Sequence, residues 1–116
     1  GGLSHTLTSA EHLRVCARSL GSSAERDRAV QTWLERACLK EMAHVTVACL
    51  TLSMRRRLGV ACSLISDAQM VLLDMPTAAL DAHSVAVIHS MITTWQTEVE
   101  GRSLVLATHS VNEASQ

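Results

Sequence analysis

The sequence predicts an α/β fold in which a helical part precedes a small parallel sheet. Residues 70–73 (MVLL) and 104–107 (LVLA) are short apolar runs with the length of buried strands. A helical pattern over about 82–99 separates them, and the order strand–helix–strand requires parallel strands joined by a right-handed crossover. Residues 1–66 carry mainly helical patterns. We therefore expect a helical subdomain over 1–66 and a βαβ unit over 67–116.

The helical part is expected to begin near Ser9, after a T-x-x-E capping box. Gly21 is a residue type that favours the position after a helix, so we expect this helix to end there. A second capping signal at Ser22 predicts a second helix, whose apolar residues recur at helical spacing: Ala29, Val30, Trp33, Leu34 and Ala37. Residues 39–50 are less regular, and 44–51 could be mistaken for a strand.

The next elements lead into and out of the first strand. Thr51 is expected to cap a helix over about 52–66, whose inner stripe would be Leu58, Ala61, Cys62 and Ile65. The strand then begins at Met70 and ends before Pro76, which cannot donate a ladder hydrogen bond. Asp81 should cap the helix over 82–99, with the following residues inward: Val85, Ile88, Met91, Ile92 and Trp95. Residues 100–102 are expected to form a turn.

Composition excludes several classes of function. The 116 residues form at most one domain, and the net charge of −1 gives no reason to expect a polyanionic partner. With 2 Trp and no Phe or Tyr, the chain lacks the stacking platforms of single-stranded nucleic-acid binders, so we expect no nucleic-acid partner. No apolar run is long enough to span a bilayer. The chain opens with Gly1, so we expect a fragment of a longer protein.

The four cysteines, Cys16, Cys38, Cys49 and Cys62, are widely spaced and form no C-x-x-C pair. The six histidines are scattered and show no metal-ligand spacing. We expect plain buried thiols, because free cysteine behaves as a small hydrophobic residue. Metal or disulfide use is the alternative, and reduced thiols fit a cytosolic location.

Asp74 closes the first apolar run, at the strand end where α/β proteins bind ligands. In P-loop NTPases, an acid at this place holds the Mg²⁺ that bridges the nucleotide phosphates. The stretch MVLLDMPTAALD resembles the Walker B motif and D-loop of an ATP-binding cassette (ABC) ATPase, with matches at Asp74, Pro76, Thr77 and Asp81. The opening residues and the stretch LTLSMRRRL are most similar to the A subfamily of lipid exporters.

This resemblance covers nearly the whole chain and implies a partial P-loop NTPase (ABC ATPase) fold. Residues 1–66 would be the helical signature subdomain, with a signature-like loop at 50–54. Residues 67–116 would carry the Walker B, D-loop and switch-histidine elements. The implied cofactors are ATP and Mg²⁺. The implied partners are a second nucleotide-binding domain and the transmembrane domains of the parent transporter.

The resemblance also assigns roles to single residues. Thr51, Leu52 and Ser53 would meet the γ-phosphate of ATP held by the opposite domain, although Leu52 and Ser53 replace two glycines of the family pattern. Asp74 would hold Mg²⁺ through the nucleotide. Asp81 would contact the partner domain. His109 would be the switch histidine, next to the γ-phosphate and the attacking water. The arginines 55–57 are either helix-surface charge or a residual attraction for phosphate.

Met75 occupies the position where the family has its glutamate, the general base. The chain also contains no G-x-x-x-x-G-K-[ST] loop to bind phosphates. These departures imply a degenerate site, and we expect the isolated chain to have no ATPase activity and no bound nucleotide. The second apolar run would lack the neighbouring strand that it has in the family, which predicts an exposed edge prone to aggregation.

The resulting hypothesis is a partial, degenerate nucleotide-binding domain of an ABC-type, lipid-related transporter. It would contribute signature and Walker B elements to ATP binding and hydrolysis. The parent protein would act at the cytoplasmic face of a membrane, with this segment itself soluble. The first alternative is a non-catalytic structural or regulatory module that keeps the fold without ATP turnover. A second is the product of a decayed gene.

Overall fold

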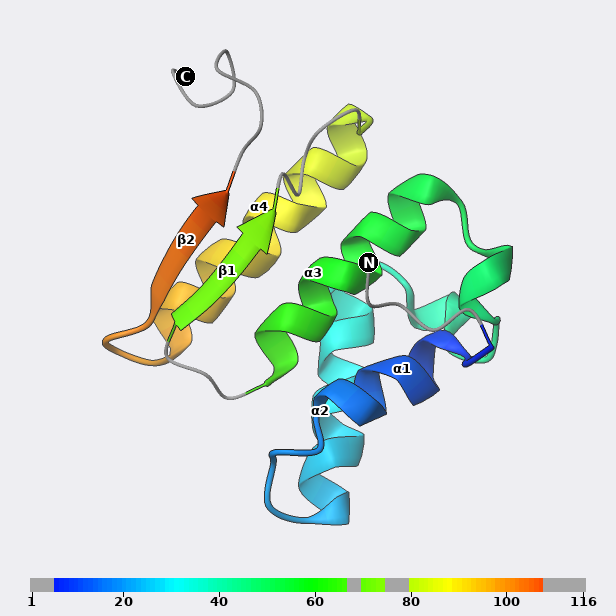
Figure 1. Cartoon of the computed structure of the whole chain (residues 1–116), viewed down its shortest axis with the longest axis horizontal. Coiled ribbons are helices and arrows are strands. Elements are labelled where there is room, and N and C mark those ends of the chain that lie inside the picture. Colours follow the sequence, from blue (N-terminus) through cyan, green and yellow to red (C-terminus); the bar gives the residue numbers. More distant parts are fainter. Residues whose placement is uncertain (1–5, 67–69, 75–79, 108–116) are drawn as a thin grey trace.

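A computed structural model describes residues 6–66, 70–74 and 80–107 of the chain. These residues form, in order, the elements α1 (Ser9–Cys16), α2 (Ser23–Arg36), the 3₁₀ helices η1 (Lys40–Met42) and η2 (Val47–Cys49), α3 (Leu52–Ile65), β1 (Met70–Asp74), α4 (Ala82–Glu98) and β2 (Ser103–Ala107). Figure 1 shows the helices gathered beside the two strands. No helix in these described ranges combines the length and the apolar character needed to cross a membrane.

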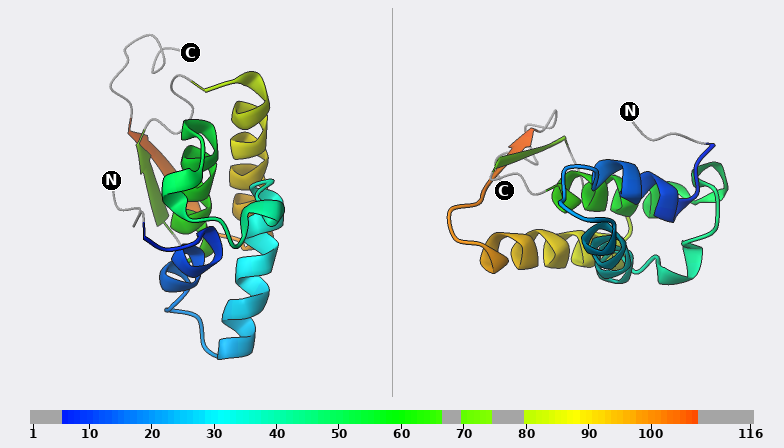
Figure 2. Two further views of the ribbon diagram at one scale, coloured as in Figure 1. Left: turned by 90° about the vertical axis from the view of Figure 1, so that its right-hand side faces the viewer. Right: turned by 90° about the horizontal axis from the view of Figure 1, so that it is seen from below.

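The two strands pair in parallel, which confirms the predicted βαβ unit. Their register runs from Met70 opposite Ser103 to Asp74 opposite Ala107. In both views of Figure 2, α3 and α4 lie on the same side of the strand pair. The turn that leads into β2 contains Gly101 at φ 91°, a left-handed conformation that costs glycine little. This turn was predicted at 100–102.

One hydrophobic core joins the helical part to the βαβ unit. It includes Leu13 of α1, Leu34 of α2, Leu58 of α3 and Trp95 of α4, none of which exposes any surface, and Val71 of β1 belongs to the same cluster. Burying side chains of this size stabilises a fold by roughly 1.5–3 kcal/mol each. The packing between α3 and α4 is therefore a continuous part of the core.

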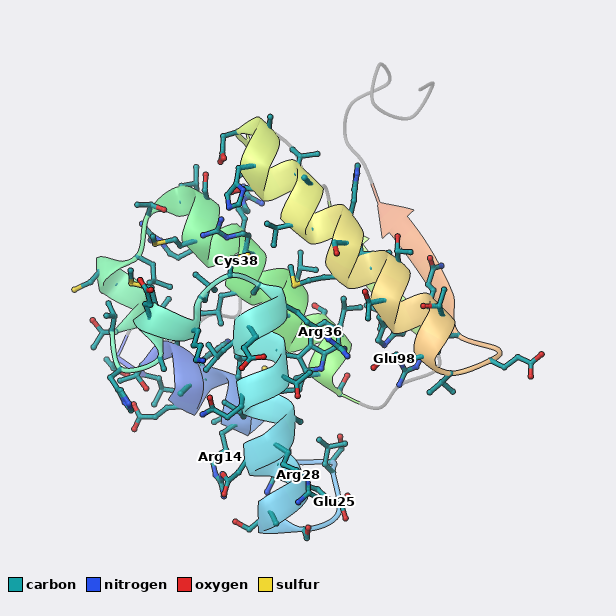
Figure 3. All side chains as sticks on the ribbon, turned by 180° about the vertical axis from the view of Figure 1, so that it is seen from behind. Arg14, Glu25, Arg28, Arg36, Cys38 and Glu98 are labelled. Atoms are coloured by element: carbon teal, nitrogen blue, oxygen red, sulfur yellow. The ribbon has the colours of Figure 1, made fainter. Side chains whose placement is uncertain are left out.

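Two ion pairs link the outer surfaces of the helices, and Figure 3 labels both residues of the second pair, Arg36 and Glu98. Arg14 of α1 pairs with Asp27 of α2. Arg36 of α2 meets Glu98 of α4 with two parallel contacts, Nη1 to Oε1 at 2.9 Å and Nη2 to Oε2 at 2.6 Å. The second pair connects elements from the two predicted parts of the chain.

The end of α1 differs from the prediction. The helix stops at Cys16, and residues 17–21 form turns in place of the expected continuation to Gly21. Gly21 does not have a positive φ; in the described residues only Gly101 does so among the glycines. The turn keeps Ala17 fully buried and Leu20 against the core, and Arg26 of α2 donates a hydrogen bond to the Leu20 carbonyl at 3.1 Å. Tertiary packing therefore ends this helix.

Residues 39–50 are not a strand. They hold η1 and η2, and a single antiparallel bridge joins Thr8 to Thr46. The Val47 N–H donates to the Leu7 carbonyl at 2.9 Å, and the Val47 side chain is completely buried. These contacts fix the segment that leads into α3.

The predicted caps of the later helices are confirmed. Thr51 and Asp81 are the N-cap residues of α3 and α4, and each accepts a hydrogen bond from the backbone three residues later. All four predicted inner residues of α3 are buried. In α4, Val85 is only half-buried, and Val87 is buried in addition to the other predicted residues.

The cysteines do not share one environment, contrary to the expectation of buried thiols. Only Cys62 is buried, Cys16 is half-buried, and Cys38 and Cys49 are exposed. No cysteine forms a disulfide among the described residues. Cys38 and Cys49 lie in the irregular region after α2, where loops carry side chains on the surface.

Cys38 also holds an unusual backbone conformation at the end of α2. Its φ is 57°, a left-handed value that no other described non-glycine residue adopts. The Cys38 N–H donates to the Glu35 carbonyl at 3.0 Å, and the Leu39 N–H donates to the Leu34 carbonyl at 2.8 Å. This pair of bonds is the Schellman motif, in which glycine is the usual residue at this place.

We predict that Cys38→Gly stabilises the protein. The left-handed conformation costs an L-residue about 1–2 kcal/mol, and the greater freedom of glycine in the unfolded chain offsets part of the gain. The expected net increase in the free energy of unfolding is about 0.5–1 kcal/mol, measured by urea denaturation. Cys38→Ala serves as the control, since it removes the thiol and keeps the strained Cβ. An equal gain in both variants would show that the thiol, not the backbone, is responsible.

Candidate functional site

The candidate site lies where the ends of two strands and two helices come together. The carboxyl ends of β1 and β2 and the amino ends of α3 and α4 lie on one side of the molecule (Figure 1). We call this region the carboxyl edge and define it by residues 51–54, 74, 81–84 and 107. In α/β proteins, ligand chemistry occurs at this edge of the sheet.

Asp74 is the last residue of β1, as the sequence predicted. It pairs in the register with Ala107, the last residue of β2. Met75 follows Asp74 directly, and His109 comes two residues after Ala107. Both Met75 and His109 lie outside the described residues, as do Pro76 and Thr77. The backbone therefore brings the strand ends that precede Met75 and His109 side by side.

The start of α3 holds the three predicted signature-loop residues. The Thr51 hydroxyl accepts a hydrogen bond from the Met54 N–H at 3.2 Å and so caps the helix. The Leu52 side chain is 55% exposed. The Ser53 hydroxyl donates to Oδ1 of Asp81 at 2.9 Å. The structure thus brings together Ser53 and Asp81, which the sequence assigned to two separate motifs.

Asp81 carries a stable negative charge at this edge. Its Oδ2 accepts the Ser84 N–H at 3.1 Å. Hydrogen bonds from the Ser84 side chain, the Ser53 side chain and the Ser84 backbone lower the pKa of the Asp81 carboxyl from 3.8 to about 2. Each of these bonds favours the ionised form. Asp81 therefore stays charged throughout the neutral range, at the amino end of α4 where an anion is favourable.

Arg57 extends this network into the protein interior. Only 6% of its surface is exposed, and its Nη1 donates to the Ser84 hydroxyl at 3.3 Å. Its Nε is buried without a hydrogen-bond partner among the described residues. Arg56 is exposed and Arg55 is half-buried. The interpretation of these arginines as helix-surface charge thus holds for Arg56. It is wrong for Arg57, whose side chain extends from α3 to Ser84 of α4.

Ser84 and the buried position of Arg57 were not predicted. A signal for them exists in the sequence, because Ser53 and Arg57 are four residues apart and Ala61 four further, which places them along one helix face. Ala61 is fully buried. Ser84 stands three residues after the N-cap Asp81, the spacing at which a cap accepts a backbone hydrogen bond.

The α3 amino end retains part of what a phosphate needs. The Leu52 and Ser53 N–H groups have no acceptor within the helix, and the positive end of the helix dipole favours an anion. Leu52 opposes this, because its exposed apolar side chain stands at the first helical position. The amino end of α3 therefore offers N–H donors of the kind that bind phosphate, and the exposed apolar side chain of Leu52 stands beside them.

We predict a pH-dependent effect of Asp81→Asn on stability. The folded pKa lies below the unfolded one, so the charged carboxylate stabilises the fold above about pH 4, and this contribution is lost as the pH falls through about 2. The difference in unfolding free energy between wild type and Asp81→Asn should be largest near pH 6 and should shrink toward pH 2. Urea denaturation at several pH values measures it.

Glu100→Gln is the control for that experiment, because Glu100 is exposed and lies in the turn after α4. Glu100 takes no part in the hydrogen bonds that Asp81 forms with Ser53 and Ser84, so its variant should not reproduce the pH profile expected for Asp81→Asn. A gap for Asp81→Asn that is unchanged between pH 6 and pH 2.5 would contradict the role given to the Ser53 and Ser84 hydrogen bonds.

Comparisons with known proteins give related sequences. No family model matches the chain. The chain is 36% identical over 113 residues to the Nod factor export ATP-binding protein I of Sinorhizobium fredii, covering 97% of this chain and 32% of that protein. It is 32% identical over 113 residues to the retinal-specific phospholipid-transporting ATPase ABCA4 of Homo sapiens, covering 97% of this chain and 5% of that protein. The chain thus spans about a third or less of these relatives.

Solved structures of ATP-binding cassette proteins have a fold similar to that of this chain. An ATP-binding cassette in a dimeric, post-hydrolysis state bound to ADP and Pi has a TM-score of 0.77 at 25% identity, covering 95% of this chain and 49% of that chain. The ATP-binding subunit of an ABC transporter has a TM-score of 0.77 at 24% identity, covering 97% and 46%. Similarity in both sequence and fold therefore shows that the chain belongs to the ABC ATPase family and corresponds to a part of its ATP-binding domain.

Proposed function

We propose that the chain is a degenerate part of the nucleotide-binding domain of an ABC transporter, and that it supplies signature and Walker B elements to an ATP site shared with a second such domain. The observation that carries this proposal is the pairing of Asp74 with Ala107 at the ends of two parallel strands. This arrangement puts an acid next to the strand end that leads to His109. The capped start of α3 lies at the same edge.

Each residue has a defined part in the proposed site. Asp74 would help to hold Mg²⁺ through the nucleotide, and His109 would contact the γ-phosphate. The α3 amino end would offer its N–H groups to a phosphate of ATP bound by the partner domain. Asp81 would face that partner, with its carboxylate held by Ser53 and Ser84. When bound, Mg²⁺ neutralises the charge that develops on the phosphates.

The parent protein is proposed to move a lipid. One relative is named as a phospholipid-transporting ATPase, and the stretch LTLSMRRRL resembles the corresponding stretch of lipid exporters. The membrane contact would then come from transmembrane domains of the parent or of a partner. The nucleotide site of the parent would lie at the cytoplasmic face of the membrane.

Met75 makes this site degenerate, because a thioether cannot accept a proton from water. General-base catalysis by a positioned carboxylate contributes roughly 10²–10⁴-fold to a rate. We therefore expect the complete protein, assembled with its partner domain, to turn over ATP slowly at this site.

Met75→Glu in the complete assembly should raise ATP turnover at this site by about 10²-fold or more, because it restores a base. The matched control is Met75→Gln, which has nearly the shape of glutamate and no basic carboxylate, and which should leave turnover at the wild-type level. Phosphate release under saturating Mg-ATP measures the rate. A wild-type rate equal to that of Met75→Glu would disprove the degenerate assignment.

A non-catalytic module is the second candidate, and Leu52 favours it. This side chain is apolar and exposed at the helix end where a phosphate would bind. The Thr51 hydroxyl is already used by the Met54 N–H, and the Ser53 hydroxyl by Asp81. In this alternative, the chain would keep the ABC fold to dock on a partner domain without ATP.

Leu52→Gly should tighten the binding of a labelled ATP analogue to the complete assembly, because glycine permits close approach of the phosphate to the α3 amino end. Leu52→Ala should give an intermediate affinity, since it removes most of the bulk and keeps the Cβ. Equilibrium binding with and without Mg²⁺ measures both. If wild type and both variants show no Mg²⁺-dependent binding, the non-catalytic module is the correct function.

A further inference from the structure

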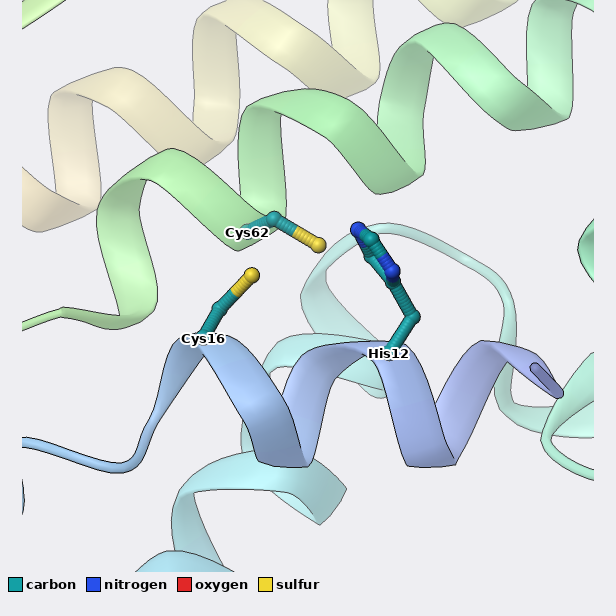
Figure 4. A group of neighbouring side chains, drawn as sticks. All are labelled: His12, Cys16 and Cys62. Atoms are coloured by element: carbon teal, nitrogen blue, oxygen red, sulfur yellow. The ribbon is translucent and has the colours of Figure 1, made fainter. Parts of the chain in front are cut away.

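A second group of reactive side chains lies between α1 and α3, apart from the carboxyl edge. His12 and Cys16 of α1 and Cys62 of α3 each offer one ligand atom, and these atoms all lie within 4.8 Å of one another. Figure 4 shows the imidazole and the two thiol groups converging from the two helices. His12 and Cys16 are four residues apart, so they share one face of α1. In the described part of the chain, this is the one group of at least three such residues.

The burial of the group indicates a missing partner. Only 6% of the His12 surface is exposed, and its Nδ1 has no hydrogen-bond partner among the residues that the structure describes. Cys62 is 9% exposed, and Cys16 is half-buried. A buried polar atom without a partner destabilises a fold. A metal ion bound through the Nδ1 atom of His12 would remove this penalty.

We propose that His12, Cys16 and Cys62 bind one Zn²⁺ ion at the interface of α1 and α3. Imidazole nitrogen and thiolate sulfur are the ligands that zinc prefers in proteins. Two thiolates neutralise the charge of Zn²⁺, so the occupied site is compatible with burial. The fourth position of the tetrahedron is filled by water on the half-buried side of Cys16.

The geometry requires only a small adjustment. Zinc–sulfur bonds of about 2.3 Å and zinc–nitrogen bonds of about 2.0–2.1 Å put neighbouring ligand atoms about 3.5–3.8 Å apart in a tetrahedron. The ligand atoms lie within 4.8 Å of one another, so they would approach by about 1.3 Å at most. Rotation about the side-chain bonds of His12 and Cys16 supplies such a shift without moving the helices.

Protonation also agrees with metal binding. A hydrogen bond from the Cys62 thiol, and then the charge of Arg18, lower the pKa of the Cys16 thiol to about 7, although burial opposes this. The same hydrogen bond and burial raise the pKa of Cys62. Burial lowers the pKa of His12, which keeps the imidazole neutral. Binding of Zn²⁺ therefore releases the proton of Cys62 and the fraction of a proton that Cys16 still holds, and none from His12.

The test is a titration of the complete, reduced protein with Co²⁺ and then with Zn²⁺ in the absence of air. We expect one Co²⁺ per chain, with a thiolate-to-cobalt charge-transfer absorption that Zn²⁺ displaces. The double variant Cys16→Ala/Cys62→Ala should lose this absorption, and His12→Ala should weaken it. The matched control Cys38→Ala/Cys49→Ala removes two exposed thiols and should bind like wild type.

Several results would overturn the proposal. These are no Co²⁺ absorption in the wild type, binding that survives Cys16→Ala/Cys62→Ala, or binding that disappears in Cys38→Ala/Cys49→Ala. A disulfide between Cys16 and Cys62 that forms in air, together with no metal uptake by the reduced protein, would also overturn it. Circular dichroism of each metal-free variant shows whether it folds, and the wild-type titration stands without any variant. No nucleotide enters this experiment, so its outcome is independent of the proposed ATPase role.

Discussion

The packing of α3 against four other elements is the constraint on which the rest of the structure depends. The elements α1, α2, α4 and β1 all contact α3, and half of its length is buried, at Arg57, Leu58, Val60, Ala61, Cys62, Leu64 and Ile65. A helix surrounded in this way cannot place all its polar residues in solvent. Arg57 is therefore buried against α4, and Cys62 faces α1. The packing of α3 therefore places both Arg57 in the hydrogen-bond network with Ser84 and Cys62 in the group with His12 and Cys16.

The network from Ser53 through Asp81 and Ser84 to Arg57 gives this packing a consequence for function. It joins the amino end of α3 to the amino end of α4 through two charged and two hydroxyl groups. If the amino end of α3 moved relative to that of α4, charge-assisted hydrogen bonds between them would break. Such bonds are stronger than hydrogen bonds between neutral groups. A change in the position of Asp81 would thus act on the amino end of α3 through its hydrogen bond with Ser53.

The sequence predicted those features that local chemistry determines. Thr51 and Asp81 mark their helices because a cap needs only a hydroxyl or carboxylate before an apolar pattern, and β1 is evident from its apolar run. The end of α1 was wrong because Ala17 and Leu20 pack on distant residues, which outweighs the preference of Gly21. Likewise, the meeting of His12 and Cys16 with Cys62 depends on how α1 lies on α3, and spacing along the chain contains no information about that contact.

The positions that match the ABC pattern do not all support nucleotide chemistry equally. Thr51 and Asp81 each cap a helix, so folding alone accounts for a hydroxyl and a carboxylate there. The Leu52 side chain is exposed and caps no helix. Its position is one at which the family pattern has glycine. Asp74 is different again, because it is the last residue of β1 and caps no helix. Its backbone lies opposite Ala107 at the carboxyl edge, the edge at which α/β proteins bind ligands, so folding of a helix does not account for an acid at this position.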